Sequence, residues 1–206
     1  MVAFETLHHM KNKKARKSGF MTMKLDMSKA YNQVEWDSLC LLMKKMGFHK
    51  RWINLIFGCI SSVSYSTLVN GEPQVDIKPS RGIRQRDPLS PYLFLLCLEG
   101  LNGLIQKHVA TCDIRGFSLC RDSPQISHLF FAGDTLLFCQ AELREVQVIK
   151  MLLGEYELAF GQKINIEKTN IFFGKSVCTS SKAAIKTFLT ILDLKEYEKY
   201  LALLEN

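Results

Sequence analysis

The feature that most constrains the fold is a pair of short apolar runs joined by a tight turn. Residues 128–131 and 135–138, with sequences HLFF and TLLF, flank Ala132-Gly133-Asp134. Apolar and aromatic runs around a Gly-Asp step predict a β-hairpin. The strands of a hairpin run antiparallel, so part of the chain must form an antiparallel sheet.

A second hairpin is predicted earlier in the chain, where Asn70-Gly71 separates residues 65–69 from residues 75–77. Pro73 lacks an N–H group and is best placed at the edge of that sheet. Two further extended segments are predicted at residues 21–25 and 164–173.

Helices are predicted between these strands. Apolar residues recur at helical spacing after Trp36, and Gly47 is placed to cap that helix. The next helix has one apolar face, made of Trp52, Leu55, Ile56 and Cys59. Asp87 and Pro88 then begin a helix that runs from about Leu89 towards His108, and its all-round hydrophobicity predicts that it is buried.

The last predicted helices are residues 142–160, ended by Gly161, and part of residues 180–206. Strands and helices are interleaved without βαβ repetition. The fold class is therefore α+β, with a mainly antiparallel sheet backed by helices.

Composition and charge narrow the class of protein. With 206 residues, 47% hydrophobic and 23% charged, the chain can form a buried core and is not a disordered polymer. Its net charge of +7 fits a polyanionic partner, either nucleic acid or an acidic membrane surface, although solubility alone explains many basic chains. The one dense basic run, residues 11–17 (KNKKARK), is either a solvated loop or a phosphate-binding or nuclear-import patch.

The seven cysteines are odd in number, scattered and mostly set among apolar residues, which predicts buried thiols in a reducing compartment. No C-x-x-C pair occurs and no histidine has zinc-ligand spacing, so no zinc module is expected. The longest apolar run, residues 89–98, is too short to span a bilayer, and the N-terminus lacks the pattern of a signal peptide. We therefore expect an intracellular protein without a membrane partner.

Two aspartates could carry chemistry. Asp26 follows the predicted strand at residues 21–25, and Asp134 lies in the turn of the 128–138 hairpin. Carboxylates at adjacent strand ends can hold Mg²⁺, which prefers oxygen ligands. A turn aspartate and a helix-capping aspartate are simpler interpretations, and the residues alone leave both open.

Four ordered segments resemble the motifs of reverse transcriptases from non-LTR (LINE-type) retrotransposons of the kind abundant in plant genomes. In motif order they are residues 23–32 (MKLDMSKAYN), 81–91 (RGIRQRDPLSP), 128–134 (HLFFAGD) and 161–169 (GQKINIEKT). The resemblance covers nearly the whole chain and implies a polymerase palm-like sheet with partial fingers and no complete thumb. It divides the chain into a basic fingers remnant (1–20), a palm and fingers core (21–175) and the start of the region leading to the thumb (176–206).

The resemblance also implies an activity and a set of site residues. Members of the family are RNA-directed DNA polymerases. They add deoxynucleotides to a DNA primer on an RNA template, using two Mg²⁺ ions. By position Asp26 and Asp134 would be the catalytic and metal-binding carboxylates, and Tyr31 would exclude a 2′-hydroxyl beneath the incoming sugar. The template and nucleotide contacts would be Gly82, Arg84 and Gln85, with Lys168 as a phosphate contact or a solvated lysine. The family's priming at chromosomal DNA implies a nuclear location.

Three positions depart from the family pattern. Gly133 replaces the first of two adjacent aspartates, the stronger metal ligand; Arg86 replaces a glycine, and Asn32 an aspartate. A metal supplies several kcal/mol of charge stabilisation, and each loss of about 1.4 kcal/mol slows a reaction tenfold, so catalysis is expected to be impaired. Asp134 could substitute only by a one-residue slip, which would turn the strand's apolar side chains to the opposite face. A non-enzymatic nucleic-acid-binding remnant that uses the basic surface is the alternative function.

Overall fold

The computed structural model describes residues 2–12, 19–27, 30–120, 123–131, 134–165 and 168–189. The chain forms two compact units. The first, called the sheet unit, comprises residues 1–28, 103–155 and 164–206, and the second, called the hairpin unit, comprises residues 29–102 and 156–163. Two helices, α4 (Ser90–Ala110) and α5 (Leu143–Phe160), contribute residues to both units.

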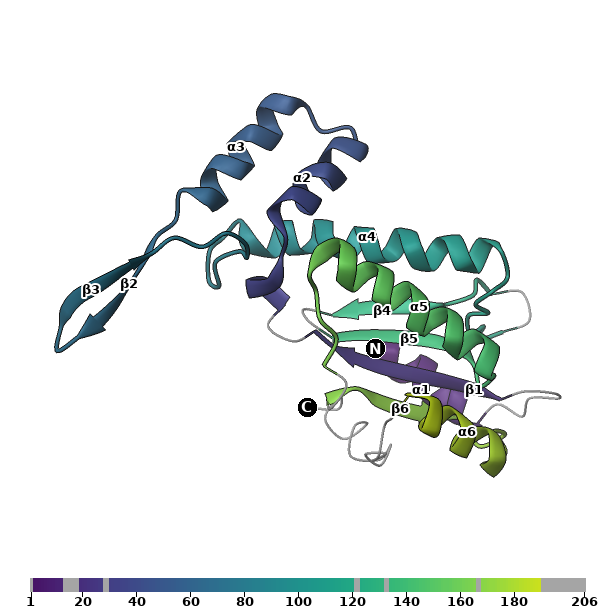
Figure 1. Ribbon diagram of the computed structural model, residues 1–206. Coiled ribbons are helices and arrows are strands. Elements are labelled where there is room, and N and C mark those ends of the chain that lie inside the picture. The colour runs from purple at the N-terminus through teal and green to yellow at the C-terminus, as the bar shows by residue number, and fades with distance from the viewer. Residues whose placement is uncertain are drawn as a thin grey trace. The chain divides into compact units, whose positions relative to one another are not determined.

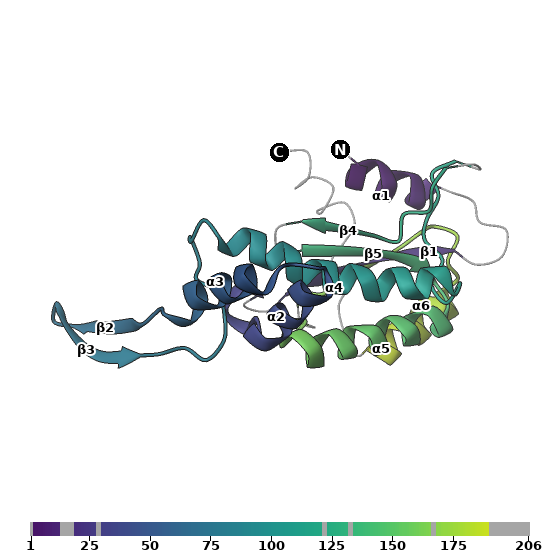
Figure 2. The same cartoon turned by 90° about the horizontal axis from the view of Figure 1, so that it is seen from above.

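The sheet unit contains a four-stranded antiparallel sheet with strand order β4-β5-β1-β6. The strands are β4 (His128–Phe131), β5 (Asp134–Gln140), β1 (Phe20–Asp26) and β6 (Asn170–Phe173). Helix α1 (Val2–Asn12) covers one face of the sheet and α5 covers the other (Figure 1, Figure 2). Helix α6 (Thr179–Leu189) lies beside α5, where Lys150 Nζ is 4.8 Å from the centre of the Phe188 ring.

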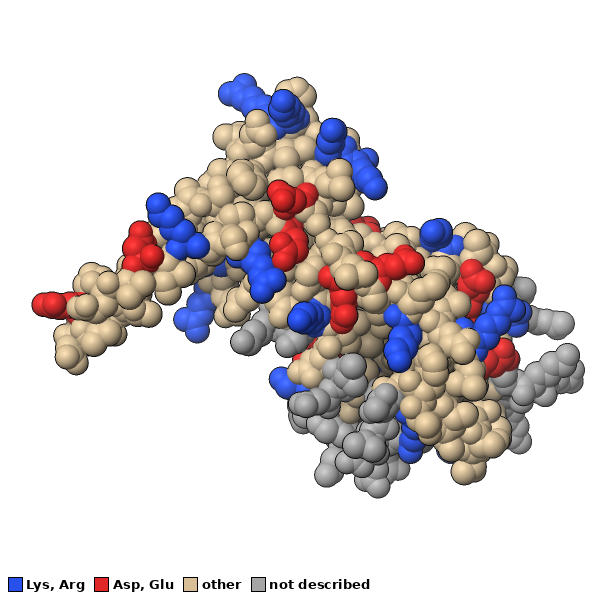
Figure 3. All heavy atoms as spheres, viewed as in Figure 1, with Lys and Arg blue, Asp and Glu red and all other residues tan. Residues whose placement is uncertain are grey.

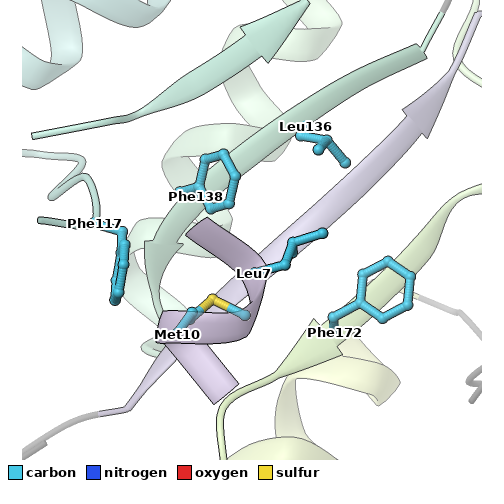
Figure 4. Close-up of a cluster of buried hydrophobic side chains, with 6 residues drawn as sticks. All are labelled: Leu7, Met10, Phe117, Leu136, Phe138 and Phe172. Carbon is cyan, nitrogen blue, oxygen red and sulfur yellow. The ribbon is translucent and has the colours of Figure 1, made fainter. Parts of the chain in front are cut away.

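The core on the α1 side of the sheet is made of large apolar side chains from distant parts of the chain. Figure 4 shows this cluster, which consists of Leu7, Met10, Phe117, Leu136, Phe138 and Phe172. Leu136 and Phe138 are two residues apart in β5 and so point to the same face of the sheet. The sequence pattern did not predict α1, yet Leu7 is fully buried in this core.

The hairpin unit contains a helix pair and a β-ribbon. Its elements are the 3₁₀ helix η1 (Ala30–Gln33), α2 (Trp36–Lys45), α3 (Lys50–Ser61), β2 (Tyr65–Val69), β3 (Glu72–Ile77) and the first part of α4. Asn70 and Gly71 join β2 to β3 with φ values of 53° and 87°, as a type I′ turn requires, so the predicted hairpin is confirmed. Both strands of this ribbon are exposed along their whole length.

The expectation that the helix from about Leu89 is buried all round was wrong. Helix α4 forms where it was predicted, but Tyr92 and Leu95 are 68% and 56% exposed, so it is buried on one face and not all round. On the predicted apolar face of α3, Trp52 is 51% exposed and Ile56 is buried. Helix α3 packs against α2 along a narrow stripe, which leaves the remainder of its apolar face in solvent.

The cysteines and the fourth motif also differ from expectation. Only Cys97 and Cys139 are buried among the seven free cysteines, because apolar sequence neighbours do not share a helix or strand face. Of the segment predicted to be extended, Ile164 forms an isolated bridge with Met27 and Asn170–Phe173 form β6, while residues 166 and 167 lie outside the described residues. No helix in the described ranges is long and apolar enough to cross a membrane.

Candidate active site

Asp26 and Asp134 lie directly opposite one another at one end of the four-stranded sheet. Asp26 is the last residue of β1 and Asp134 is the first residue of β5, so Asp134 belongs to a strand and not only to a turn. Opposed residues of an antiparallel pair project from the same face. Two carboxylates in this position repel each other unless a cation lies near them.

Lys24 supplies one such cation. It lies two residues before Asp26 in β1, which places both side chains on the same face. Its Nζ is 2.6 Å from Oδ2 of Asp134, the diagonal neighbour across the strand pair. Sequence reasoning missed Lys24, although the Lys-x-Asp spacing was a signal that it could join the aspartate face.

Asp134 is paired in one continuous strand register on both sides. Strands β1 and β5 pair without a shift from Phe20 opposite Gln140 to Asp26 opposite Asp134. Strands β4 and β5 likewise pair without a shift up to Phe131 opposite Asp134. All residues from Thr135 to Cys139 are buried, so β5 contributes side chains to the core from both of its faces. Gly133 itself lies outside the described residues.

The fourth motif lies at the same end of the sheet. The Asn165 N–H donates to the Asp26 carbonyl oxygen at 2.8 Å, next to the bridge between Met27 and Ile164. The Lys168 N–H donates to the carbonyl oxygen of Asn165, and the Thr169 hydroxyl donates to it at 2.8 Å. These bonds hold Lys168 in a turn just before β6, with its side chain exposed.

The donor set fits a single hard cation better than a pair. Mg²⁺ is commonly bound through one or two carboxylates and completes its shell with water and substrate phosphates. Asp26 and Asp134 are two such carboxylates. Within the part of the chain that the structure describes, no group of three His, Cys, Asp or Glu side chains could hold a metal ion.

In the hairpin unit, the end of the first motif contacts the start of the second. The Gly82 N–H donates to the Val34 carbonyl oxygen, and the Ile83 N–H donates to that of Tyr31, both at 2.8 Å. Gly82 has φ +90°, and a Cβ there would lie 2.8 Å from the Asn32 carbonyl oxygen. Glycine is therefore required at position 82 for close backbone packing.

Three residues that sequence reasoning assigned to template and nucleotide contacts share one cavity. Its volume is 450 Å³, and Gly82, Arg84 and Gln85 line it together with Asn32 and Arg81. Tyr31 lies in η1 of the same unit and stacks on Phe94, with ring centres 5.1 Å apart and an interplanar angle of 18°.

Arg86, which follows this group, has φ +65°. The left-handed region favours glycine, so the arginine is strained where the resembling motif has glycine.

Comparison with known proteins assigns the family. Residues 1–200 match the reverse transcriptase (RNA-dependent DNA polymerase) family. The chain belongs to this family. Reverse transcriptases generally depend on Mg²⁺, so a magnesium site is expected for members of this family. The carboxylates of Asp26 and Asp134 lie opposite one another in this chain.

The relatives of this chain include proteins of mobile elements. It is 39% identical over 106 residues to an uncharacterized mitochondrial protein of Arabidopsis thaliana, covering 52% of this chain and 86% of that protein. It is 29% identical over 162 residues to a Pol polyprotein from the retrotransposable element R2 of Popillia japonica, covering 78% of this chain. The chain spans only 22% of that polyprotein. The match to R2, a non-LTR element, agrees with the motif resemblance.

Solved structures show the same fold. The telomerase of Candida tropicalis, in complex with a fragment of telomeric RNA, superposes with a TM-score of 0.60 over 85% of this chain and 29% of the telomerase chain. At 14% sequence identity this likeness shows the fold alone. The predicted α+β class with a palm-like antiparallel sheet is confirmed.

Proposed function

We propose that this reverse transcriptase domain keeps the framework of a nucleotidyl-transfer site but has lost most of its catalytic power. The observation that carries the proposal is the register pair of Asp26 and Asp134 at the end of the central strands. Family members direct DNA synthesis from RNA, and the proposed partners are an RNA template, a DNA primer and deoxynucleoside triphosphates.

The two aspartates would hold Mg²⁺ in this proposal. The bound metal would activate the primer 3′-hydroxyl and stabilise the leaving pyrophosphate. Lys24 supports the proposal of impairment, because its ammonium group pairs with Asp134 and so competes with a metal for that carboxylate. Gly133 offers no carboxylate that could compensate.

The cavity of the hairpin unit would serve the substrate side. Arg84 is an exposed cation in its lining, and Gln85 offers both a donor and an acceptor for a template base or a nucleotide. Tyr31 would act as the floor beneath the incoming sugar, since its stacking on Phe94 fixes the plane of its ring. Lys168 would contact a phosphate from the turn beside Asp26.

The test is primer extension on an RNA template with Mg²⁺, comparing the wild-type chain with Gly133→Asp. Restoring the carboxylate should raise the extension rate by about 100-fold, since loss of a metal's charge stabilisation is worth several kcal/mol and about 1.4 kcal/mol is tenfold in rate. Magnesium affinity, measured by calorimetry, should rise in the same variant. A wild-type rate that Gly133→Asp leaves unchanged would contradict the proposed impairment.

Two further variants separate the causes of impairment. Asp26→Asn added to Gly133→Asp should remove the gained activity, because the restored site still needs its first carboxylate. Arg86→Gly should raise the free energy of unfolding by about 1 kcal/mol by relieving the strain at φ +65°, without restoring extension. Extension restored by Arg86→Gly alone would move the defect from the third motif to the second.

A further inference from the structure

The end of the helix pair in the hairpin unit is strongly basic. Residues 38–71 contain no aspartate or glutamate, and their four lysines and arginines are Lys44, Lys45, Lys50 and Arg51. All four side chains are exposed. Figure 3 shows blue side chains gathered at the top of the view, where α2 ends and α3 begins, with no red among them. We name residues 41–53 the α2–α3 corner.

The corner is built by backbone hydrogen bonds. Helix α2 ends at a Schellman motif: Gly47 has φ +87° and donates to the Lys44 carbonyl oxygen, and the Phe48 N–H donates to that of Met43 at 3.0 Å. Helix α3 begins at once, with Nδ1 of His49 accepting from the Arg51 N–H. These bonds fix the ends of the two helices that carry the four cations.

Two of the cations are badly placed for the helix itself. Lys50 and Arg51 occupy the first turn of α3, which contains no acidic residue. The N-terminus of a helix carries a partial positive charge that repels cations and attracts anions. Lys44 and Lys45, in the last turn of α2, are well placed by the same rule. An external anion at the start of α3 would offset the unfavourable charges.

An apolar groove accompanies the charges. It has a volume of 690 Å³, and its lining includes Leu41, Phe48 and Ile53 together with Lys44 and Lys50. Trp52, about half exposed, follows Arg51 in the same turn of α3. Apolar and aromatic surface between cations fits a flat base attached to a phosphate backbone. A duplex hides the faces of its bases, so the groove fits a single strand.

We propose that the α2–α3 corner binds single-stranded polynucleotide, with its four cations on successive phosphates and its groove and Trp52 against the bases. The site lies outside the four motifs and needs neither a metal ion nor a nucleotide. No group at the corner reads a 2′-hydroxyl in this proposal, so RNA and DNA strands should bind alike.

The first test is the salt dependence of binding, measured by fluorescence anisotropy with labelled dT20 and rU20 in EDTA. Each phosphate contact on a single strand contributes a slope of about −0.7 to log K against log salt, so four contribute about −2.8, or roughly 50-fold between 50 and 200 mM. The variant K44Q/K45Q/K50Q/R51Q should lose that part of the slope. Lys50→Gln alone should lose about a quarter of it, which guards against a fold defect in the fourfold variant.

The matched control is K107Q/R115Q/K150Q/K175Q, which removes three exposed lysines and one exposed arginine from the sheet unit. It has the same net charge as the corner variant and should keep most of the slope. Equal losses in the two variants would show that binding follows net charge alone and would overturn the proposal. Tighter binding to a 20-base-pair duplex, or to vesicles with anionic lipid, than to dT20 would also overturn it.

The second test uses tryptophan fluorescence. The chain has two tryptophans, and Trp36 is buried while Trp52 is exposed. Stacking of a base on Trp52 should quench the emission when dT20 binds, and Trp52→Phe should abolish the quenching while leaving circular dichroism unchanged. Quenching that persists in Trp52→Phe, or that is absent in the wild type, would overturn the role of base stacking at the corner.

Discussion

Three charged side chains decide the electrostatics at the end of β1. Sequence patterns could predict that Asp26 and Asp134 lie at the ends of strands. The strand register places the two residues opposite one another, so their side chains project from the same face of the sheet. The ion pair between Lys24 and Asp134 could not be predicted, because it depends on the side-chain conformation of a long lysine. At position 86 the second motif predicts glycine, and the chain has arginine. The backbone there nevertheless has φ +65°, a conformation that favours the predicted glycine.

The most reactive thiol is expected at Cys178. The hydroxyl groups of Ser180 and Ser181, each 3.1 Å from Sγ, lower the pKa of Cys178 to about 7. Thiolate is the reacting form, so alkylation by iodoacetamide should rise steeply through pH 7 and level off above it. Mass spectrometry of labelled peptides measures this directly.

Buried thiols provide the comparison. Burial raises the pKa of Cys97 to about 12 and that of Cys139 well above its usual range, so neither should be labelled in the folded chain. Replacing both Ser180 and Ser181 by alanine should move the midpoint for Cys178 to higher pH. A midpoint that does not move would mean that the hydroxyl groups do not stabilise the thiolate.

Among the elements, those with strong local signals were predictable. Asn70-Gly71 fixes its own turn conformation, and Gly47 ends α2 through backbone geometry that few other residues adopt. Helix α1 gave no such signal. Leu7 and Met10 anchor it in the core, but in the sequence they are next to two histidines and a basic run, which obscure an apolar helical pattern. Its burial depends on a sheet assembled from later parts of the chain.

The contribution of α1 can be measured through Leu7. Leu7→Ala should lower the free energy of unfolding by about 3 kcal/mol, since it leaves a cavity among fully packed side chains. Leu158→Ala, at a position 91% exposed in α5, is the matched control and should change it by less than about 0.5 kcal/mol. Urea unfolding monitored by circular dichroism compares the two, and equal effects would mean that α1 does not stabilise the sheet.

Across the whole molecule, protection from solvent should be very uneven. Strand β1 is paired on both sides and lies between two helical layers, whereas β2 and β3 pair only with each other and are exposed throughout. A lone two-stranded ribbon is marginally stable in water. The pattern of apolar runs predicted both hairpins alike, because local sequence does not show which sheet gains further strands.

Hydrogen exchange followed by mass spectrometry should show this difference. The amides of β1 should exchange slowest in the chain, and those of β2 and β3 should exchange fastest among the strands. Addition of dT20 should slow exchange at the α2–α3 corner and leave β1 unchanged. Protection of β2 and β3 equal to that of β1 in the free chain would contradict the exposed arrangement of the ribbon.

The way the chain is divided between its units restricts how such a domain can be recombined. Each unit has segments on both sides of residues 103–155. A genetic crossover with a relative anywhere in that stretch would give both units residues from two parents. Chimeras that exchange one unit intact therefore need paired breakpoints near residues 28 and 102, with residues 156–163 exchanged as well.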